Sequence, residues 1–114
     1  GPPTALLDGD LQTRWSSEYS APQHIVLKWD DAVKLKQVKL HWETAAAQAY
    51  TVLASRDGES WRKMKDKSST QLGPRVDNIS LKGVRTRFLK LELKKRLKSD
   101  WGFSLYEIEL IAPE

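Results

Sequence analysis

Hydrophobic and polar residues alternate along most of this chain with a period of two, which is the periodicity of a half-buried β-strand. The clearest alternation covers residues 35–42, in which Val38, Leu40 and Trp42 share one face and Lys39 lies on the other. We therefore expect the first three side chains in a hydrophobic core. Similar runs predict further strands at residues 24–29, 49–55, 60–64, 76–81, 87–93 and 104–111.

Turn-forming residues separate the predicted strands at intervals of about eight to twelve residues, as in sandwiches and barrels. The strongest signal is the pair Asp57-Gly58, which predicts a hairpin between residues 49–55 and 60–64. Residues 65–74 are polar and rich in turn formers, so we expect a loop there. No segment has the pattern of a helix longer than one or two turns. The sequence predicts an all-β fold, with a meander as its simplest connectivity.

The chain has 114 residues and no cysteine. This length predicts a single domain, residues 1–114, with one core and no room for a second domain. The absence of cysteine excludes a disulfide framework, a thiolate metal site and a cysteine nucleophile. No run approaches the roughly 18 apolar residues of a membrane span, and the N-terminal Gly1-Pro2-Pro3 resembles no targeting peptide. We expect a module excised from a larger protein.

Residues 8–19 begin with two carboxylates, a glycine and a hydroxyl and continue with aromatic and charged residues. Asp8, Asp10 and Thr13 offer three oxygen atoms to a hard cation such as Ca²⁺, which takes about six to eight oxygen ligands. Gly9 lets the backbone turn sharply between the two acids. An Asx turn, in which the acids only bind their own backbone, explains the same residues. The residues alone leave both interpretations open.

Recognisable catalytic motifs are missing from the sequence. It has two histidines, no nucleophile elbow, no glycine-rich phosphate loop and no His-Glu-x-x-His zinc motif. A glycosidase needs two carboxylates that face each other across a cleft. The acids here fall instead in the predicted cation loop, in turns and on solvated strand faces. We expect a protein that binds its ligand without catalysis.

Positive charge dominates the second half of the chain. Nineteen lysines and arginines against fifteen acids give a formal net charge of +4, and the excess lies in residues 82–87 and 90–98. The second segment, with Lys94, Lys95, Arg96 and Lys98, offers a surface for a heparin-like glycan, nucleic acid or another protein. The competing interpretation is a solvated strand end, because the segment has none of the interleaved aromatic residues of a single-strand nucleic-acid platform.

Four sequence blocks resemble a known family. They are residues 8–25, residues 38–50, S-R-D-G-E-S-W at residues 55–61, and residues 87–91 leading to W-G-F-S-L-Y-E-I-E at residues 101–109. Their order and spacing are similar to those of discoidin-like, coagulation-factor C-type (F5/8 type C) domains, and in particular of the family 32 carbohydrate-binding modules of secreted glycoside hydrolases. The resemblance implies a jelly-roll β-sandwich of the galactose-binding-domain-like kind and non-catalytic binding of a polysaccharide or glycan.

The resemblance also implies a structural calcium ion. In such modules a D-G-D-x-x-T loop and a glutamate of the last strand hold the ion, which stabilises the fold without chemistry on the bound ligand. Carried over to this sequence, the metal ligands are the carbonyl groups of Ala5 and Tyr106 and the side chains of Asp8, Asp10, Thr13 and Glu107. Glu107 therefore favours the metal interpretation of the loop over the Asx turn.

Carbohydrate recognition combines an aromatic face for the pyranose ring with planar polar groups for its hydroxyls. The resemblance implies these groups in T-R-W-S-S-E and W-E-x-A motifs like those of modules on chitosanases and β-1,3-glucanases. The predicted ligand-binding residues are Arg14, Tyr19 and Glu43, with Glu18 and Trp101 as outer members. Structural roles compete with binding: Arg14 in an ion pair with either glutamate, Tyr19 over the core, and Trp101 as a core plug.

The other four tryptophans are assigned to the core or to sheet packing. Tryptophans in strands usually bury their area, and we expect this of Trp15, Trp29, Trp42 and Trp61. His24 and His41 are predicted to face solvent or a neighbouring strand. Relatives that bind membranes carry a disulfide and apolar loop spikes, which this sequence lacks. We expect a secreted, periplasmic or cell-surface module, monomeric in isolation, that binds glycans and not membranes, with nucleic acid disfavoured.

Overall fold

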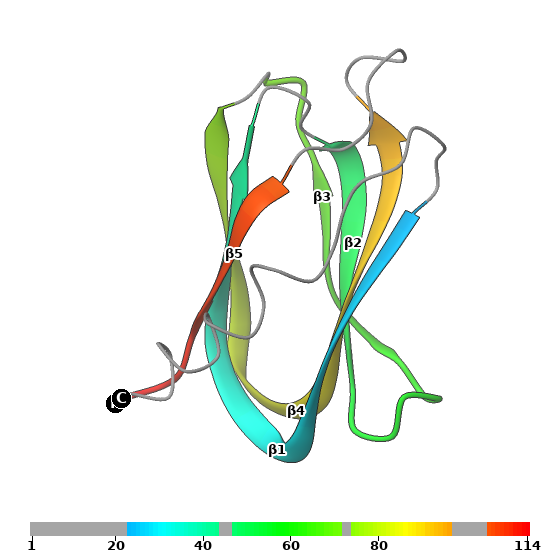
Figure 1. The fold of residues 1–114 in the computed structure, drawn as a ribbon, viewed down its shortest axis with the longest axis vertical. Helices are drawn as coiled ribbons and strands as arrows, with labels where there is room; N and C mark the ends of the chain where they lie inside the picture. Colours follow the sequence, from blue (N-terminus) through cyan, green and yellow to red (C-terminus); the bar gives the residue numbers. More distant parts are fainter. Residues whose placement is uncertain (1–22, 44–46, 72–73, 97–104) are drawn as a thin grey trace.

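The computed structural model describes residues 23–43, 47–71, 74–96 and 105–114, and these ranges form one antiparallel sheet of five strands (Figure 1). In sheet order the strands are β3 (Arg62–Ser68), β2 (Ala47–Ser55), β4 (Arg75–Arg96), β1 (Gln23–Trp42) and β5 (Leu105–Ile111). Within the described ranges there is no helix long and apolar enough to cross a membrane. The predicted all-β class is confirmed.

Two long bent strands turn this single sheet into a sandwich. The first half of β1 pairs with the second half of β4, from Gln23↔Leu93 to Lys28↔Phe88, and the second half of β1 pairs with the first half of β4 up to Trp42↔Arg75. Strands β2 and β3 extend one layer, whereas β5 extends the other, so the two layers face each other (Figure 1). The predicted β-sandwich is thus confirmed.

The hydrophobic core lies between the two layers, as the alternation predicts. Val38, Leu40 and Trp42 are completely buried, whereas Lys39 and His41 on the opposite face are half-buried. The same period of two buries Leu89, Leu91 and Leu93 in β4 and Tyr50, Val52 and Ala54 in β2. The inward faces of the long strands therefore supply most of the core, and the outward faces remain available for polar contacts.

Three details of the predicted strands are wrong. Residues 24–29 and 35–42 belong to one strand, β1, and residues 76–81 and 87–93 belong to one strand, β4. Residues 65–68, expected in a loop, continue β3, because their backbone pairs with β2 although their side chains are polar. The connectivity is not a meander, since β4 lies between β1 and β2. Such nonlocal pairing leaves no pattern in the local sequence.

The bend of β4 uses backbone conformations that most residues avoid. Lys82 and Gly83 both have positive φ angles, 55° and 69°, and the pairing with β1 shifts register close to this point, between Leu35 and Gln37. Glycine adopts this left-handed conformation without steric cost, whereas lysine does not. The bend therefore separates the two halves of β4 that belong to different layers.

The hairpin predicted at Asp57-Gly58 joins β2 to β3, and its turn is held by side chains. Asp57 Oδ1 accepts hydrogen bonds from Ser55 Oγ and from the backbone N–H groups of Glu59 and Ser60, at 2.8–3.0 Å. The backbone bonds, followed by the Ser55 bond, lower the pKa of this carboxyl. Gly58 has a φ of 81°, and an added Cβ there would lie 3.0 Å from the Phe88 ring.

Alanine substitutions at the two glycines with positive φ angles distinguish the effect of backbone strain on stability from the effect of steric crowding. Gly83→Ala introduces a Cβ into open space, so we expect it to lower the free energy of unfolding by about 1–2 kcal/mol through the φ angle alone. Gly58→Ala adds the contact with Phe88 to the same strain and should cost more. Urea unfolding followed by tryptophan fluorescence measures both. Equal losses would show that the Phe88 ring moves away freely.

Candidate functional site

One end of the sandwich collects strand termini from both layers. We call it the Glu43 end: β1 finishes there at Trp42, β4 begins at Arg75, and β5 begins at Leu105 (Figure 1). Trp42 pairs with both Arg75 and Leu105. Binding residues on a rigid sandwich tend to lie at such ends, where loops leave the strands.

A buried ion pair organises the Glu43 end. The side chains of Arg75 and Asp77, two residues apart on β4, are only 3% and 6% exposed. Arg75 donates from Nε to Asp77 Oδ1 at 3.1 Å and from Nη2 to Asp77 Oδ2 at 3.2 Å. A further bond runs from Arg75 Nη1 to the carbonyl oxygen of Gln71. The bidentate geometry compensates both charges for their loss of water.

Two core aromatic residues complete the hydrogen bonding of Asp77. Tyr50 Oη donates to Asp77 Oδ2 at 2.6 Å, and Trp42 Nε1 donates to the same oxygen at 3.0 Å. Burial, followed by the bond to Asp77, raises the pKa of the Tyr50 phenol well above its ordinary value. The phenol therefore stays a proton donor at every physiological pH. This cluster of four side chains, which we call the Asp77 network, joins β1, β2 and β4.

Glu43 directly follows Trp42 and is exposed at this end of the molecule. Its backbone position is set by a tryptophan that is fully buried and bonded to Asp77, so the carboxylate projects from a rigid base. The other predicted ligand-binding residues, Arg14, Glu18, Tyr19 and Trp101, lie outside the described residues. Sequence reasoning identified Trp42 as a framework residue and placed Tyr50 in a predicted strand, but it missed Arg75 and Asp77, which look like ordinary polar residues of a strand.

The predicted metal ligand Glu107 lies on β5 with two other candidate ligands. Glu107 is the direct cross-strand neighbour of His41, and the side chains of His41, Glu107 and Glu109 each bring one ligand atom within 4.8 Å of the others. His41 Nε2 lies 3.2 Å from Glu109 Oε1. Carboxylate oxygen suits a calcium ion, and the role of Glu107 as a metal ligand stays a prediction. Tyr106 is in β5 by its backbone, and the remaining predicted ligands, Ala5, Asp8, Asp10 and Thr13, lie outside the described residues.

In the described part of the basic segment 90–98, Lys90 lies beside an acidic and an aromatic side chain. Lys90 Nζ lies 4.2 Å from the centroid of the Trp61 ring and 3.7 Å from Glu92 Oε2. Glu92 is also 3.8 Å from Nδ1 of His24, which is half-exposed. Trp61 itself is half-buried and packs edge-on against Phe88. This part of the segment is a mixed polar strand face, as the second interpretation predicts.

The tryptophan assignments agree with the described structure. Trp42 is fully buried, Trp29 is 9% exposed, and Trp61 packs on the outer face of the sheet. His41 lies beside a neighbouring strand, and His24 faces partly toward solvent. Trp15 lies outside the described residues. None of the described tryptophans is therefore free to form an open stacking platform for a ligand.

Comparison with known proteins identifies the family. The model of the F5/8 type C domain matches residues 1–108, and the chain therefore belongs to the F5/8 type C domain family. The predicted discoidin-like resemblance is confirmed. A search of curated proteins gave no match.

Solved structures of carbohydrate-binding modules share the fold. Chitosan-binding module 2 of a chitosanase/glucanase from Paenibacillus sp. IK-5, in complex with chitotriose, is 26% identical, with 96% of this chain and 89% of that chain covered and a TM-score of 0.73. Module 1 of the same enzyme is 26% identical over 85% and 74% of the two chains, with a TM-score of 0.72. The family 32 module of AlyQ, in complex with 4,5-unsaturated mannuronic acid, is 20% identical over 94% and 83%, with a TM-score of 0.72, and shows the fold alone.

The Asp77 network predicts a large and specific loss of stability. Asp77→Asn keeps the side-chain shape but removes the carboxylate that forms the bidentate ion pair with the buried Arg75 guanidinium, so we expect a loss of about 3–5 kcal/mol in the free energy of unfolding. Tyr50→Phe removes only one hydrogen bond to a charged group and should cost about 1.5–3 kcal/mol. Urea unfolding monitored by fluorescence tests both variants. If Asp77→Asn lowered the free energy of unfolding by less than Tyr50→Phe does, this result would contradict the central role of the ion pair.

Proposed function

We propose that this chain is a non-catalytic carbohydrate-binding module whose ligand binds at the Glu43 end. The observation that carries the proposal is the likeness to a chitosan-binding module in complex with chitotriose, over 96% of this chain, together with an exposed carboxylate on a rigid base at Glu43. The proposed contacts are Arg14, Glu18, Tyr19, Glu43 and Trp101. Tyr19 supplies an aromatic face for a sugar ring, and the charged groups bind its polar substituents.

The charge of Glu43 favours an amino sugar as the ligand. A chitosan unit carries an ammonium group, and a carboxylate that binds it forms a charge-assisted hydrogen bond, which is about twice as strong as a neutral one. Glu18 would add a second carboxylate to the same site. The proposed substrate class is therefore an oligosaccharide or polysaccharide of glucosamine type, bound through its amine and one ring face.

The same structural similarity supports a proposal for the role of the module in a larger protein. The related chitosan-binding modules derive from a chitosanase/glucanase, which supports a role in holding an attached glycoside hydrolase on its polysaccharide. Such a role requires a secreted, periplasmic or cell-surface location. The module itself is proposed to act as a monomer, because all five proposed contacts come from a single chain. The comparisons do not favour the alternative, a polyanion or protein-interaction surface on residues 90–98.

The amino-sugar proposal predicts a selective loss in Glu43→Gln. This variant keeps the shape of the side chain and removes its charge, so we expect chitotriose binding to weaken by about tenfold or more. Glu59→Gln is the matched control, because Glu59 is an exposed carboxylate in the hairpin at the opposite end of the sandwich. Isothermal titration calorimetry with chitotriose and with laminarin compares the variants.

The outcomes separate the site from the ligand class. Equal affinities for chitotriose in the Glu43→Gln and Glu59→Gln variants would remove Glu43 from the site. Loss of binding to both glycans in Tyr19→Ala, with unfolding unchanged, would support the site itself. Laminarin binding with no chitotriose binding in the unmodified protein would overturn the amino-sugar class while retaining carbohydrate recognition.

A structural calcium ion is the second part of the proposal. The ligands would be Glu107 together with Asp8, Asp10, Thr13 and the carbonyl groups of Ala5 and Tyr106. The half-buried position of Glu107 on β5, close to the side chains of His41 and Glu109, supports this role, as does the oxygen chemistry of the proposed set. Bound in this way, calcium would connect the N-terminal loop to the last strand and stabilise only the folded state.

Calcium binding predicts a thermal shift that depends on Glu107. At a calcium concentration about 100-fold above its dissociation constant, the folded state should gain about 2.7 kcal/mol, seen as a higher melting temperature than in chelator. Glu107→Gln should abolish most of this difference. Glu92→Gln is the control, because Glu92 is a half-buried carboxylate on another strand. Equal melting temperatures of the unmodified protein in calcium and in chelator would contradict the proposal.

A further inference from the structure

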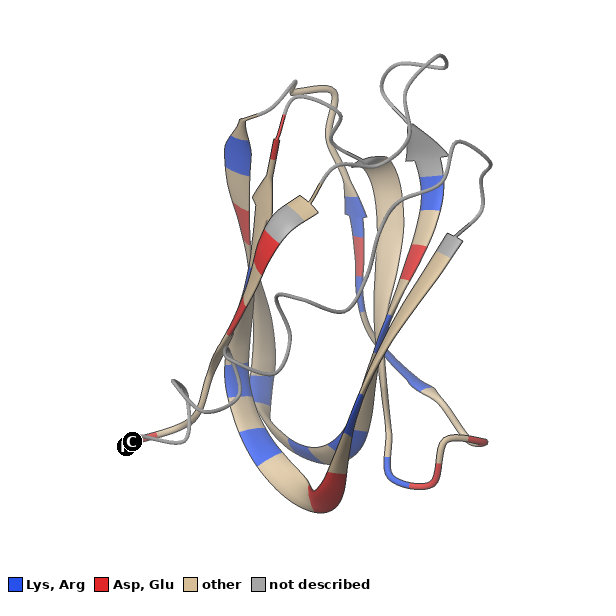
Figure 2. Cartoon of the chain, viewed as in Figure 1, with Lys and Arg blue, Asp and Glu red and all other residues tan. Residues whose placement is uncertain are grey.

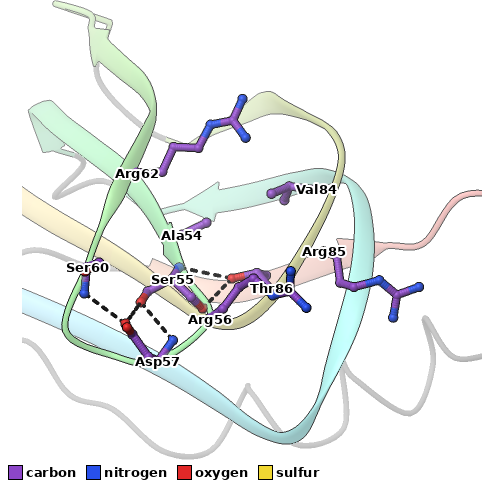
Figure 3. A pocket seen from close by; sticks show the side chains of 9 residues that line it. All are labelled: Ala54, Ser55, Arg56, Asp57, Ser60, Arg62, Val84, Arg85 and Thr86. Carbon is purple, nitrogen blue, oxygen red and sulfur yellow. Dashed lines mark hydrogen bonds between the residues drawn. The ribbon is translucent and has the colours of Figure 1, made fainter.

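A pocket of about 290 Å³ lies at the end of the sandwich opposite Glu43, between the β2–β3 hairpin and the bend of β4 (Figures 1 and 3). Three of its lining side chains are arginines: Arg56 in the turn, Arg62 at the start of β3, and Arg85 after the bend. The other lining side chains are mostly small or polar. Residues from three separate segments thus place positive charge around one concavity.

The three arginines form no ion pair with any of the described residues. Each is exposed, and none of their guanidinium groups forms a hydrogen bond or ion pair with any residue in the described ranges. Asp57 is the one acid that lines the pocket. Its Oδ1 atom accepts three hydrogen bonds that hold the turn, and its carboxylate forms no ion pair with any of the three arginines.

Strand register adds a fourth positive charge beside the pocket. Lys34 on β1 is the direct cross-strand partner of Arg85 on β4, and both residues are exposed. Like charges in this arrangement destabilise a sheet. Figure 2 shows Lys and Arg on the bends of β1 and β4 at this end, with acidic residues at the tip of the β1 bend and in the hairpin. Of the acids in these two segments, Asp57 lines the pocket, whereas Asp30, Asp31 and Glu59 do not.

The floor of the pocket is rigid and already satisfied in its hydrogen bonds. Thr86 is fully buried, and its hydroxyl accepts a bond from Ser55 N at 3.1 Å and lies 2.8 Å from the Ser55 carbonyl oxygen. These contacts tie β2 to β4 next to Arg85 and Arg56. The arginines therefore lie beside a fixed base, with the Arg85 side chain extending away from it (Figure 3), and a ligand would meet their charges without first breaking an ion pair among the described residues.

We propose that this pocket, which we call the arginine pocket, is a second binding site that takes an oxyanion group of an acidic polysaccharide, a sulfate or a carboxylate. Guanidinium groups present planar pairs of N–H donors that match such oxyanions. A bound oxyanion would screen the repulsion among Arg56, Arg62, Arg85 and Lys34. Because the pocket lies opposite Glu43, the module binds acidic and amino-sugar ligands at separate places, and neither site depends on the other.

The test compares two doubly substituted proteins with the same change in net charge. Arg62→Gln with Arg85→Gln removes two charges of the arginine pocket. Lys65→Gln with Lys94→Gln removes two charges from exposed strand positions that do not line it. The probes are a heparin-derived tetrasaccharide, an oligogalacturonate and inorganic sulfate, titrated at low and moderate salt with amide chemical shifts and calorimetry as readouts.

We expect the tetrasaccharide or the oligogalacturonate to shift the amide signals of Ser60, Arg62 and Thr86 in the unmodified protein. The arginine variant should lose about tenfold or more in affinity, and the lysine variant much less. Equal losses in both variants would overturn the site in favour of general charge attraction. Inorganic sulfate binding as tightly as the tetrasaccharide would overturn the polysaccharide as its ligand.

The same variants separate this proposal from the one at the Glu43 end. The arginine variant should retain chitotriose binding and cooperative urea unfolding, which shows that its fold is intact. Glu43→Gln should retain the response to the tetrasaccharide. Loss of tetrasaccharide binding in Glu43→Gln would place the acidic ligand at the Glu43 end and overturn the second site, whereas failure of chitotriose to bind any form would leave the arginine pocket unaffected.

Discussion

The structure depends on the carboxylate of Asp77, which is buried with its charge and must therefore be fully paired. Arg75 supplies the counter-charge, and Trp42 and Tyr50 supply the remaining donors. A buried ion that loses one partner costs more than the pair contributes, so these four side chains act together. They come from β1, β2 and β4, and they set the geometry from which Glu43 leaves the sheet. The Glu43 end is thus held in place by the pairing of a buried charge as well as by hydrophobic packing.

The bends of β1 and β4 give this sandwich two distinct ends. Each long strand crosses from one layer to the other, so strand termini collect at the Glu43 end and bends collect at the opposite end (Figure 1). The bends of β1 and β4 and the Asp57-Gly58 hairpin together form the end opposite Glu43. The positive φ angles of Lys82 and Gly83 are the backbone cost of this arrangement. The same bend carries Arg85 to the edge of the arginine pocket.

Local patterns in the sequence predict the strands, the core face and the hairpin, because alternation and turn chemistry act between near neighbours. Val38, Leu40 and Trp42 are buried as their spacing predicts. The order of the strands in the sheet cannot be predicted from local patterns, because the position of β4 between β1 and β2 depends on pairing between residues far apart in the sequence. The burial of Arg75 and Asp77 could not be predicted for a related reason. Two charged residues at positions i and i+2 of a strand share one face, and the sequence does not indicate that a second layer covers that face.

Basic residues that are clustered in this sequence are not the ones that are clustered in the folded structure. Residues 90–98 hold the densest basic run of the sequence, yet alternation sends neighbouring residues of a strand to opposite faces, and Lys90 lies among Trp61 and Glu92. Arg56, Arg62 and Arg85 are scattered along the sequence, but a hairpin and a bend bring them to one pocket, where none of them forms an ion pair with a described residue. Concentrated charge on a β-sandwich therefore follows from register and from the places where strands turn. The fold itself decides which of the basic residues of this chain can act together.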